Sequence, residues 1–279
     1  MEVVMYKETI GKIYIKNGQL FEIENMYNEE VKNNSIYEVI RMVKGVPLFM
    51  EDHIIRLVNS ASLMGYDIKE NISTIFDGVG KLILGNDFID GNFKILISEK
   101  NGSINYICFF IESHYPDEEM YKKGVPSVLY FTERENPNAK ALNLEYKSKV
   151  KKILEETKAY EALLVNEKGF LTEGSRSSLF IVIEGCVYTS PGKGVLLGIT
   201  RQKVLKLCRQ LLIPIMETDL HVDILAEADA LFITGTSPKI LPISTVNGDA
   251  VGSPNNKILQ RIIDAYNNEI MDYISSCDL

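Results

Sequence analysis

The chain has 279 residues, 46% of them hydrophobic and 24% charged, which is typical of a soluble globular protein with one large or two smaller cores. The formal net charge of -8 argues against nucleic acid or an anionic membrane as the main partner, and no apolar run is long enough to span a bilayer. With four scattered cysteines, three histidines and no signal-like pattern in the first residues, we expect a cytoplasmic protein without a metal site.

The first half of the chain predicts a strand, a helix and a hairpin. The β-branched, apolar stretch IYEVIRMV at 36–43 predicts a buried strand. After a turn, apolar residues at helical spacing predict a helix that Gly65 ends. The stretch at 93–113 predicts two strands joined at Asn101-Gly102, because Asn-Gly is a strong hairpin signal.

The second half predicts further helices and strands after a polar stretch at 132–141, which looks like a connection between domains. Helical patterns lie at 145–160, 199–213 and 255–274, and strand patterns at 161–190 and 228–246. The two kinds of element mix without a regular βαβ rhythm, so we expect an α+β protein. The predicted organisation is an N-terminal domain at 1–130, a linker at 131–139 and a C-terminal domain at 140–279.

Two stretches have the composition of an anion site. In LLGITRQKV at 196–204, Gly198 precedes Ile199 and Thr200 where a helix begins, and the free amides of a helix start attract phosphate. The alternative is that Thr200 only caps the helix. In FITGTSPK at 232–239, Thr236 and Ser237 follow a strand and could form an anion nest, or only an ordinary turn.

The predicted helix before Gly65 carries His53, Arg56 and Ser60 at positions i, i+3 and i+7. We expect these three side chains to share a face opposite the apolar residues of the helix. Arginine is well suited to bind a phosphate, so Arg56 is a candidate ligand. The alternative is an ordinary solvated helix face.

A lysine and a glutamate stand out by their neighbours. Lys140 follows Ala139 and precedes Ala141, and a lysine in apolar surroundings becomes a nucleophilic amine that can form an imine, although it could equally be an ordinary lysine near a loop end. Glu173 lies in a strand-like segment beside Gly174 and several serines. A crowded carboxylate needs a cationic or hydrogen-bonding partner, and small neighbours let a ligand come close.

Together, these candidates match the groups of one cofactor. Pyridoxal 5'-phosphate has an aldehyde for a lysine, a ring nitrogen that can be protonated and a phosphate. Its ring nitrogen would be the partner of Glu173, and the small residues around Glu173 would admit the flat ring.

With these stretches in this order, the chain resembles the class IV (fold type IV) pyridoxal-phosphate aminotransferases: branched-chain aminotransferase, D-amino-acid transaminase and 4-amino-4-deoxychorismate lyase. The residues that carry the resemblance are YEVIR, DHIIRLVNSA, KALNL, EALLVNEKGFLTEGSRSSLF, LLGITR and ADALFITGTSPKILPI. The resemblance implies a smaller N-terminal α/β domain, a larger C-terminal pseudo-barrel domain and a homodimer.

The resemblance also implies roles for individual residues. Lys140 would be catalytic, forming the imine with the cofactor and shuttling the proton. The implied cofactor-binding residues are Glu173 at the ring nitrogen, Arg56, Ile199, Thr200 and Thr236 at the phosphate, and Ser178, which stands where many members have Asn. Tyr37 and Arg41 would face the substrate. Its carboxylate would be bound by Arg41, Arg176 or the amides near Ser237, which we do not rank.

Several functions share these cofactor residues. The leading hypothesis is an aminotransferase that acts on an aliphatic, branched-chain-like amino acid and a 2-oxo acid through a Schiff base on Lys140. The alternative is an aminodeoxychorismate lyase that forms p-aminobenzoate and pyruvate in the folate pathway. A D-amino-acid transaminase is less favoured, because the basic pair expected after the strand at 93–99 is absent. A non-catalytic pyridoxal-phosphate-binding protein is suggested only by Ser178.

Overall fold

The computed structural model describes residues 8–29, 33–100 and 102–277 and divides the chain into two compact units. The first unit takes its described residues from Met1–His114, Ala139–Leu144 and Tyr273–Leu279, and the second from Tyr115–Asn138 and Glu145–Asp272. These boundaries differ from the predicted ranges 1–130, 131–139 and 140–279, which stay a prediction about domains. Strand β7 (Val125–Phe131) belongs to the second unit because it pairs with two strands there, and residues 139–144 bond to the first.

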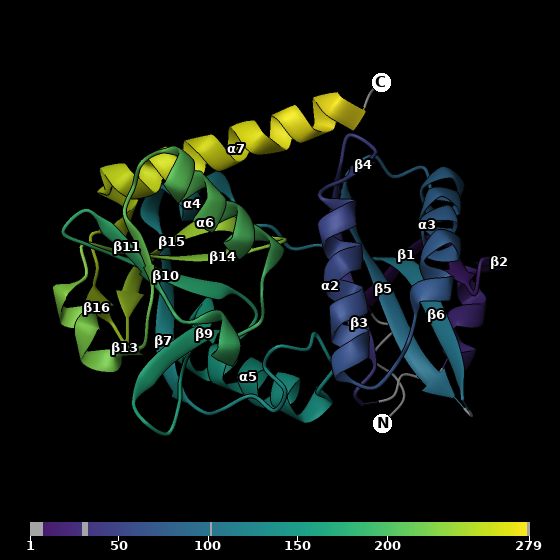
Figure 1. Cartoon of the computed structure of the whole chain (residues 1–279), viewed down its shortest axis with the longest axis horizontal. Helices are drawn as coiled ribbons and strands as arrows, with labels where there is room; N and C mark the ends of the chain where they lie inside the picture. The colour runs from purple at the N-terminus through teal and green to yellow at the C-terminus, as the bar shows by residue number, and fades with distance from the viewer. Residues whose placement is uncertain (1–7, 30–32, 101, 278–279) are drawn as a thin grey trace. The chain divides into compact units, whose positions relative to one another are not determined.

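The first unit contains a six-stranded sheet in the order β2-β1-β6-β5-β3-β4, and every strand pair recorded in it is antiparallel. The strands are β1 (Thr9–Lys16), β2 (Gln19–Glu22), β3 (Ile36–Val43), β4 (Val46–Pro47), β5 (Gly91–Lys100) and β6 (Ser103–Ile111). Helices α2 (Met50–Leu63) and α3 (Ile72–Gly85) pack on one face of this sheet (Figure 1). Two short 3-10 turns, η1 (Ile23–Asn28) and η2 (Lys69–Asn71), complete the unit.

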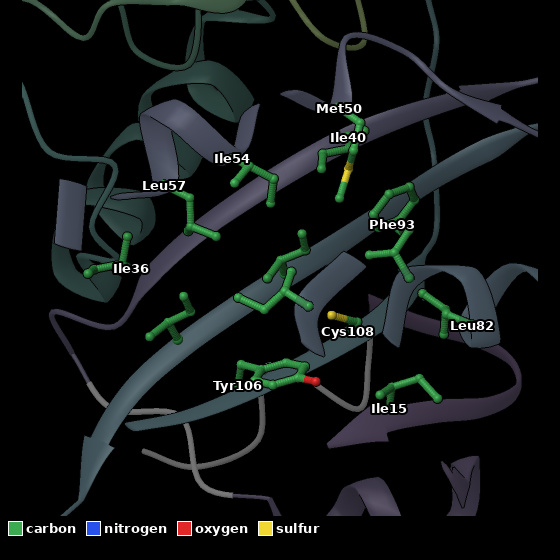
Figure 2. Packing of buried hydrophobic residues seen from close by; sticks show 14 of the residues in the cluster. Ile15, Ile36, Ile40, Met50, Ile54, Leu57, Leu82, Phe93, Tyr106 and Cys108 are labelled. Carbon is green, nitrogen blue, oxygen red and sulfur yellow. The ribbon is translucent and has the colours of Figure 1, made fainter. Parts of the chain in front are cut away.

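Apolar side chains fill the space under the two helices. Figure 2 shows Ile40 and Phe93 from the sheet against Ile54 and Leu57 of α2, with Leu82 of α3 beside them. The helix predicted before Gly65 is therefore present, because its apolar stripe has a sheet to cover. The predicted hairpin is also present, since Lys100 pairs with Ser103, although Asn101 itself lies outside the described residues.

Strand β3 is not buried along its whole length as predicted. Its exposure alternates: Ile36, Glu38, Ile40 and Met42 are buried, and the residues between them are half-buried. Successive residues of a strand point to opposite faces, and only one face of this sheet lies under α2 and α3. Tyr37 and Arg41 therefore lie on the face that these helices do not cover.

The second unit contains a mixed ten-stranded sheet in the order β12-β11-β10-β14-β15-β7-β8-β9-β13, with β16 paired to β15. Besides β7, its strands are β8 (Glu161–Val165), β9 (Phe170–Gly174), β10 (Ser178–Ile183), β11 (Cys186–Thr189), β12 (Ile215–Glu217), β13 (Leu220–His221), β14 (Ala230–Gly235), β15 (Lys239–Val246) and β16 (Asp249–Ala250). Strand β7 runs parallel to β8 and β15, and β11 runs parallel to β12. One face of the sheet packs a core that includes Leu163, Leu179, Ile181 and Ile233.

The helices and 3-10 turns of this part of the chain are α4 (Glu118–Lys123), α5 (Leu144–Thr157), η3 (Gly192–Gly194), α6 (Ile199–Gln210), η4 (Val222–Glu227), η5 (Ser253–Asn255) and α7 (Lys257–Cys277). The last turn of α7, from Tyr273, is grouped with the first unit. Within the described ranges, every helix is too short or too polar to cross a membrane.

Candidate functional site

Lys140 is held at an edge of the first unit's sheet, beside β3. Its carbonyl oxygen accepts a hydrogen bond from Tyr37 N–H at 3.0 Å, and its N–H donates to Ser60 Oγ of α2 at 3.1 Å. Ala141 forms a bridge with Ile36, so residues 140–142 run antiparallel to the start of β3. The Nζ atom lies 5.0 Å from the centroid of the Tyr37 ring. Its chain neighbours Ala139 and Leu142 are buried, with exposures of 2% and 6%.

Arg56 belongs to a buried ionic cluster. Glu38 of β3 is fully buried and accepts from Arg56 Nε at 2.7 Å and Arg56 Nη2 at 2.6 Å. His53 Nδ1 lies 2.7 Å from the second oxygen of Glu38. Burial alone would raise the pKa of Glu38, but Arg56 and His53 outweigh it and lower that pKa from 4.5 to about 2. The carboxylate therefore accepts only, and His53 donates from Nδ1.

His53 is neutral in this cluster. Burial lowers its pKa below 6.5, and the positive charges of Arg56 and Lys140 act in the same direction, while Glu38 opposes them. The neutral ring leaves Glu38 with one guanidinium as its counter-charge. This ion pair orients the Arg56 guanidinium.

The prediction that His53, Arg56 and Ser60 lie opposite the apolar face of their helix is wrong, and so is the solvated alternative. All three are buried, with exposures of 3%, 8% and 1%, as are Ile54 and Leu57. The buried arc of α2 is wide because β3 offers it Glu38, and residue 140 offers it a backbone N–H. Polar side chains can then be buried beside apolar ones with their hydrogen bonds made.

Tyr37, Arg41 and Lys94 lie on the sheet face away from α2 and α3. Val39 of β3 is paired with Lys94 of β5, and Tyr37 with Leu96, so strand alternation brings the three residues to one face. Lys94 is 5% exposed, and its Nζ lies 5.8 Å from the Tyr37 ring centroid and 5.7 Å from that of Phe109. It forms an ion pair with Glu8. No sequence pattern singled out Lys94.

Glu173 has a cationic partner within the second unit. Arg134 Nη1 donates to Glu173 Oε1 at 2.7 Å, and Leu196 N–H donates to Glu173 Oε2 at 3.1 Å. Glu173 is 4% exposed, so this pairing answers the charge of a nearly buried group. Arg134 comes from the stretch predicted as a polar connection. Both carboxylate oxygens of Glu173 are thus acceptors, one from a guanidinium and one from a backbone amide.

The serines that follow Glu173 have a structural role. Ser175 and Ser177 donate through their hydroxyls to Glu161, the first residue of β8, which is fully buried. The small residues Gly174, Ser175 and Ser177 are therefore required by a buried carboxylate, whether or not a ligand approaches them. No sequence pattern singled out Glu161.

Ser178 lies beside the start of α6. A Cβ added to Gly198 would stand 2.9 Å from Ser178 Oγ, so glycine lets the helix start approach this close. Gly198 is the N-cap of α6, and the cap makes no side-chain hydrogen bond. The alternative that Thr200 caps the helix is therefore wrong. Gln202 N–H makes the first helical bond, to Gly198 O at 3.0 Å, so the amides of residues 199–201 precede it.

A buried hydroxyl lies next to this helix start. Thr234 is paired with Ser178 across β14 and β10. It is 2% exposed, and among the described residues its Oγ1 atom has no hydrogen-bond partner. Thr200 is also buried, and its hydroxyl lies 3.4 Å from Tyr266 Oη. The start of α6 therefore combines helix amides with three buried hydroxyls, those of Ser178, Thr200 and Thr234.

Thr236 and Ser237 lie in the tight turn between β14 and β15, where Gly235 pairs with Lys239. Tyr121 Oη donates to Pro238 O at 2.9 Å and ties this turn to the unit. Arg176 is directed to Tyr160, with Nη2 donating to Tyr160 O at 2.9 Å and the guanidinium 5.3 Å from the Tyr160 ring.

The structure therefore collects the predicted residues in two groups. In the first unit Tyr37 and Lys140 are in contact, and Arg56 lies on α2 with Ser60, which binds residue 140. In the second unit Ser178 lies at the start of α6 with Ile199 and Thr200. Glu38, Lys94, Arg134 and Glu161 were missed. Glu38, Lys94 and Glu161 are charges within or beside apolar stretches, whereas nothing in the polar stretch at 132–141 distinguishes Arg134.

A family model described as "Amino-transferase class IV" matches residues 35–246. D-alanine aminotransferase of Bacillus licheniformis is 28% identical over 244 residues, covering 79% of this chain and 81% of that protein. D-alanine aminotransferase of Staphylococcus epidermidis is 27% identical over 258 residues, covering 86% and 90%. The structure of branched-chain amino acid aminotransferase from Escherichia coli superposes with a TM-score of 0.82 at 23% identity, covering 94% of this chain and 95% of that one.

The last likeness shows a shared fold. It consists of an antiparallel N-terminal sheet domain and a curled, mixed half-barrel as the C-terminal domain. The predicted two-domain α+β fold of type IV is confirmed.

Proposed function

The chain belongs to the amino-transferase class IV family, and from this membership we propose that it transfers an amino group between an aliphatic, branched-chain-like amino acid and a 2-oxo acid. Family membership confirms two predictions from the sequence, an aminotransferase enzyme and pyridoxal 5'-phosphate as its cofactor. The substrate and the roles of individual residues are our proposals.

The residues of this chain fit the cofactor. The start of α6 has helix amides before its first internal hydrogen bond and a buried, unpartnered hydroxyl on Thr234 nearby, which suits a phosphate. Glu173 is a nearly buried carboxylate paired with Arg134, and a carboxylate suits a protonated ring nitrogen as its donor. Lys140 supplies a primary amine. We assign the phosphate to Arg56, Ile199, Thr200 and Thr236, and we include Ser178 among the cofactor residues.

When bound, pyridoxal phosphate supplies an aldehyde that condenses with primary amines and a ring that withdraws electrons from the adjacent carbon. In our assignment Lys140 Nζ takes the proton from the substrate's Cα. It then delivers this proton to the cofactor's aldehyde carbon, on the other side of the substrate nitrogen. Glu173, paired with Arg134, keeps a proton on the ring nitrogen. Tyr37 packs against Lys140 and limits the positions that its amine can take.

The observation that carries the proposal is the anchoring of Lys140. Hydrogen bonds to Tyr37 N–H and Ser60 Oγ hold its backbone on two sides, so only the flexible side chain moves. Moving a proton between two nearby carbon atoms needs a lysine whose backbone is fixed and whose amine can reach both atoms. A lysine at the end of a loop would lack this restraint.

The sheet face that carries Tyr37 supports an aliphatic substrate. Its buried side chains include Leu96, Ile107 and Phe109, which would contact an uncharged side chain favourably. Lys94 and Arg41 share this face and are our candidates for the substrate carboxylate. Arg176 is disfavoured by its contacts with Tyr160, and the amides near Ser237 remain a further candidate.

A second candidate is transamination of D-amino acids. The relatives named as D-alanine aminotransferases favour it.

The test is to mix the cofactor-loaded protein with single L- and D-amino acids, follow the cofactor absorbance, and measure glutamate formed from 2-oxoglutarate. We expect L-branched-chain donors to react fastest. A faster reaction with D-alanine would establish the second candidate, and release of p-aminobenzoate from aminodeoxychorismate would instead identify a lyase. We also expect a homodimer, which light scattering tests.

A further inference from the structure

Glu161 is a buried carboxylate whose recorded hydrogen-bond donors are all uncharged. It is 0% exposed and begins strand β8. Oε1 accepts from Ser175 N–H at 3.1 Å, Ser175 Oγ at 2.5 Å and Ala162 N–H at 2.9 Å. Oε2 accepts from Ser177 Oγ at 2.7 Å. Three of these four donors belong to the turn that joins β9 to β10.

Backbone contacts make the same turn compact. Gly174 N–H donates to Ser177 O at 2.8 Å, and Ser175 N–H also donates to Ala162 O at 2.8 Å. Tyr146 Oη donates to Ser175 O at 3.3 Å from helix α5. A Cβ on Gly174 would stand 2.1 Å from Ser177 Oγ and 3.1 Å from Glu161 Oε2. Any other residue at 174 would therefore push Ser177 away from Glu161.

The two ends of the turn carry residues assigned to the cofactor. Glu173 precedes Gly174, and its carboxylate contacts Arg134 and Leu196 rather than the serines. Ser178 follows the turn and lies against Gly198. Because the turn is short, movement of residues 174–177 moves both ends. Misplacement of a binding group by about 1 Å is enough to weaken its function strongly.

We propose that Glu161 is a positioning residue, which gathers Ser175 and Ser177 and thereby fixes the turn that places Glu173 and Ser178. The effect of Glu161 on cofactor binding rests on the proposed roles of Glu173 and Ser178. The effect of Glu161 on the order of the turn does not rest on those roles, and it can be measured on cofactor-free protein.

The arrangement requires an oxygen acceptor at the Oε1 place. Oε1 accepts from the backbone N–H groups of Ala162 and Ser175, which can only donate. A methionine at 161 nearly keeps the volume and offers only a weakly accepting sulfur. Glu161→Met therefore removes the acceptors of all four donors.

The experiment compares Glu161→Met with the milder Ser177→Ala, with both changes combined, and with Ser253→Ala as the control. Ser253 is also fully buried in the second unit, and its hydroxyl accepts from Leu231 N–H at 2.8 Å, away from the turn. The first measurement is amide hydrogen exchange at residues 174–178 in cofactor-free protein. We expect exchange about tenfold faster in Glu161→Met, a smaller increase in Ser177→Ala, no further increase in the double variant, and unchanged exchange in the control.

The second measurement is the dissociation constant of pyridoxal phosphate, from absorbance titration. We expect it to rise about tenfold in Glu161→Met and to stay constant in Ser253→Ala. Unchanged exchange in Glu161→Met, or faster exchange with unchanged cofactor affinity, would overturn the positioning role and leave the proposed function intact. If the unaltered protein binds no pyridoxal phosphate, the proposed function fails, and the exchange comparison alone decides whether Glu161 fixes the turn. If Glu161→Met does not fold, Ser177→Ala decides by the same two measurements.

Discussion

The two units of the molecule hold their functional side chains by different physical means. In the first unit, Arg56 is oriented by a buried ion pair with Glu38, which His53 supports by a hydrogen bond. In the second unit, the turn after Glu173 is held by serine hydroxyls and backbone amides on Glu161. Glu173 itself combines both means, with one guanidinium and one amide.

This difference has consequences for sensitivity to pH and to mutation. A buried ion pair leaves a charge uncompensated when one partner is removed, so single substitutions there are costly. A network of neutral donors loses one hydrogen bond at a time. We therefore expect the first unit to respond to acid and the turn in the second to respond gradually to substitution.

The largest effect is expected for Lys140→Ala, which removes the amine assigned to proton transfer. We expect kcat to fall by at least ~10^4-fold, since both the nucleophile and the base are lost. Mass spectrometry after borohydride reduction should find no cofactor attached to the variant. Lys149→Ala is the control, because Lys149 is exposed and pairs with Glu145 along its helix. Cofactor still trapped on Lys140→Ala would contradict the assignment.

The next largest effect is expected for Arg134→Gln in the second unit. Glu173 would remain 4% exposed without its cation, and we expect a loss of about 2 kcal/mol in the free energy of unfolding. Urea unfolding of cofactor-free protein measures this directly. Arg209→Gln, at an exposed position of α6, should change it by less than about 0.5 kcal/mol. Equal losses of unfolding free energy in the two variants would show that pairing with Glu173 does not make Arg134 more important for stability than the solvated Arg209.

A smaller effect is expected for Lys94→Met in the first unit. If Lys94 binds the substrate carboxylate, KM for the amino donor should rise about tenfold while kcat changes little. Steady-state kinetics at saturating 2-oxo acid separate the two constants. Lys81→Met, on the exposed side of α3, is the matched control. A fall in kcat with constant KM would exclude a binding role for Lys94.

The smallest effect is the pH response of the ionic cluster, tested with His53→Asn. The pKa of His53 is lowered in the folded protein, so the unfolded chain binds its proton first and stability is lost as pH falls below about 6.5. Asparagine keeps a donor toward Glu38 but does not titrate. We expect its unfolding free energy to fall less steeply from about pH 6.5 to about pH 5, by up to about 1.4 kcal/mol per pH unit.

Glu38 provides a separate window for the same comparison. Its pKa of about 2 lies below its ordinary value of 4.5, so its contribution is complete above about 4.5 and is lost as pH falls toward about 2. The unaltered protein and His53→Asn should lose this contribution to the unfolding free energy equally. Thermal unfolding at a series of pH values measures the two windows, and identical slopes above about pH 5 would show that His53 does not carry the first one.

Much of the fold could be predicted because it depends on local patterns. The apolar stripe of α2, the Asn-Gly hairpin after β5 and the helix start after Gly198 each follow from a few adjacent residues. The alternating exposure of β3 could not be predicted, since it depends on which face α2 and α3 cover. The same holds for the buried arc of α2, which is wide only because Glu38 lies beneath it.

The sequence by itself determined the chemical groups and their order: an amine at Lys140, a carboxylate at Glu173 and small or hydroxyl-bearing residues at Ser178 and Thr200. Only the tertiary structure decided which charges are paired, namely Arg56 with Glu38 and Arg134 with Glu173, and that Glu161 lies under the serine turn. The physical reason is that these partners are far apart in the chain. Strand register and helix packing, rather than any local pattern, bring them within hydrogen-bonding distance.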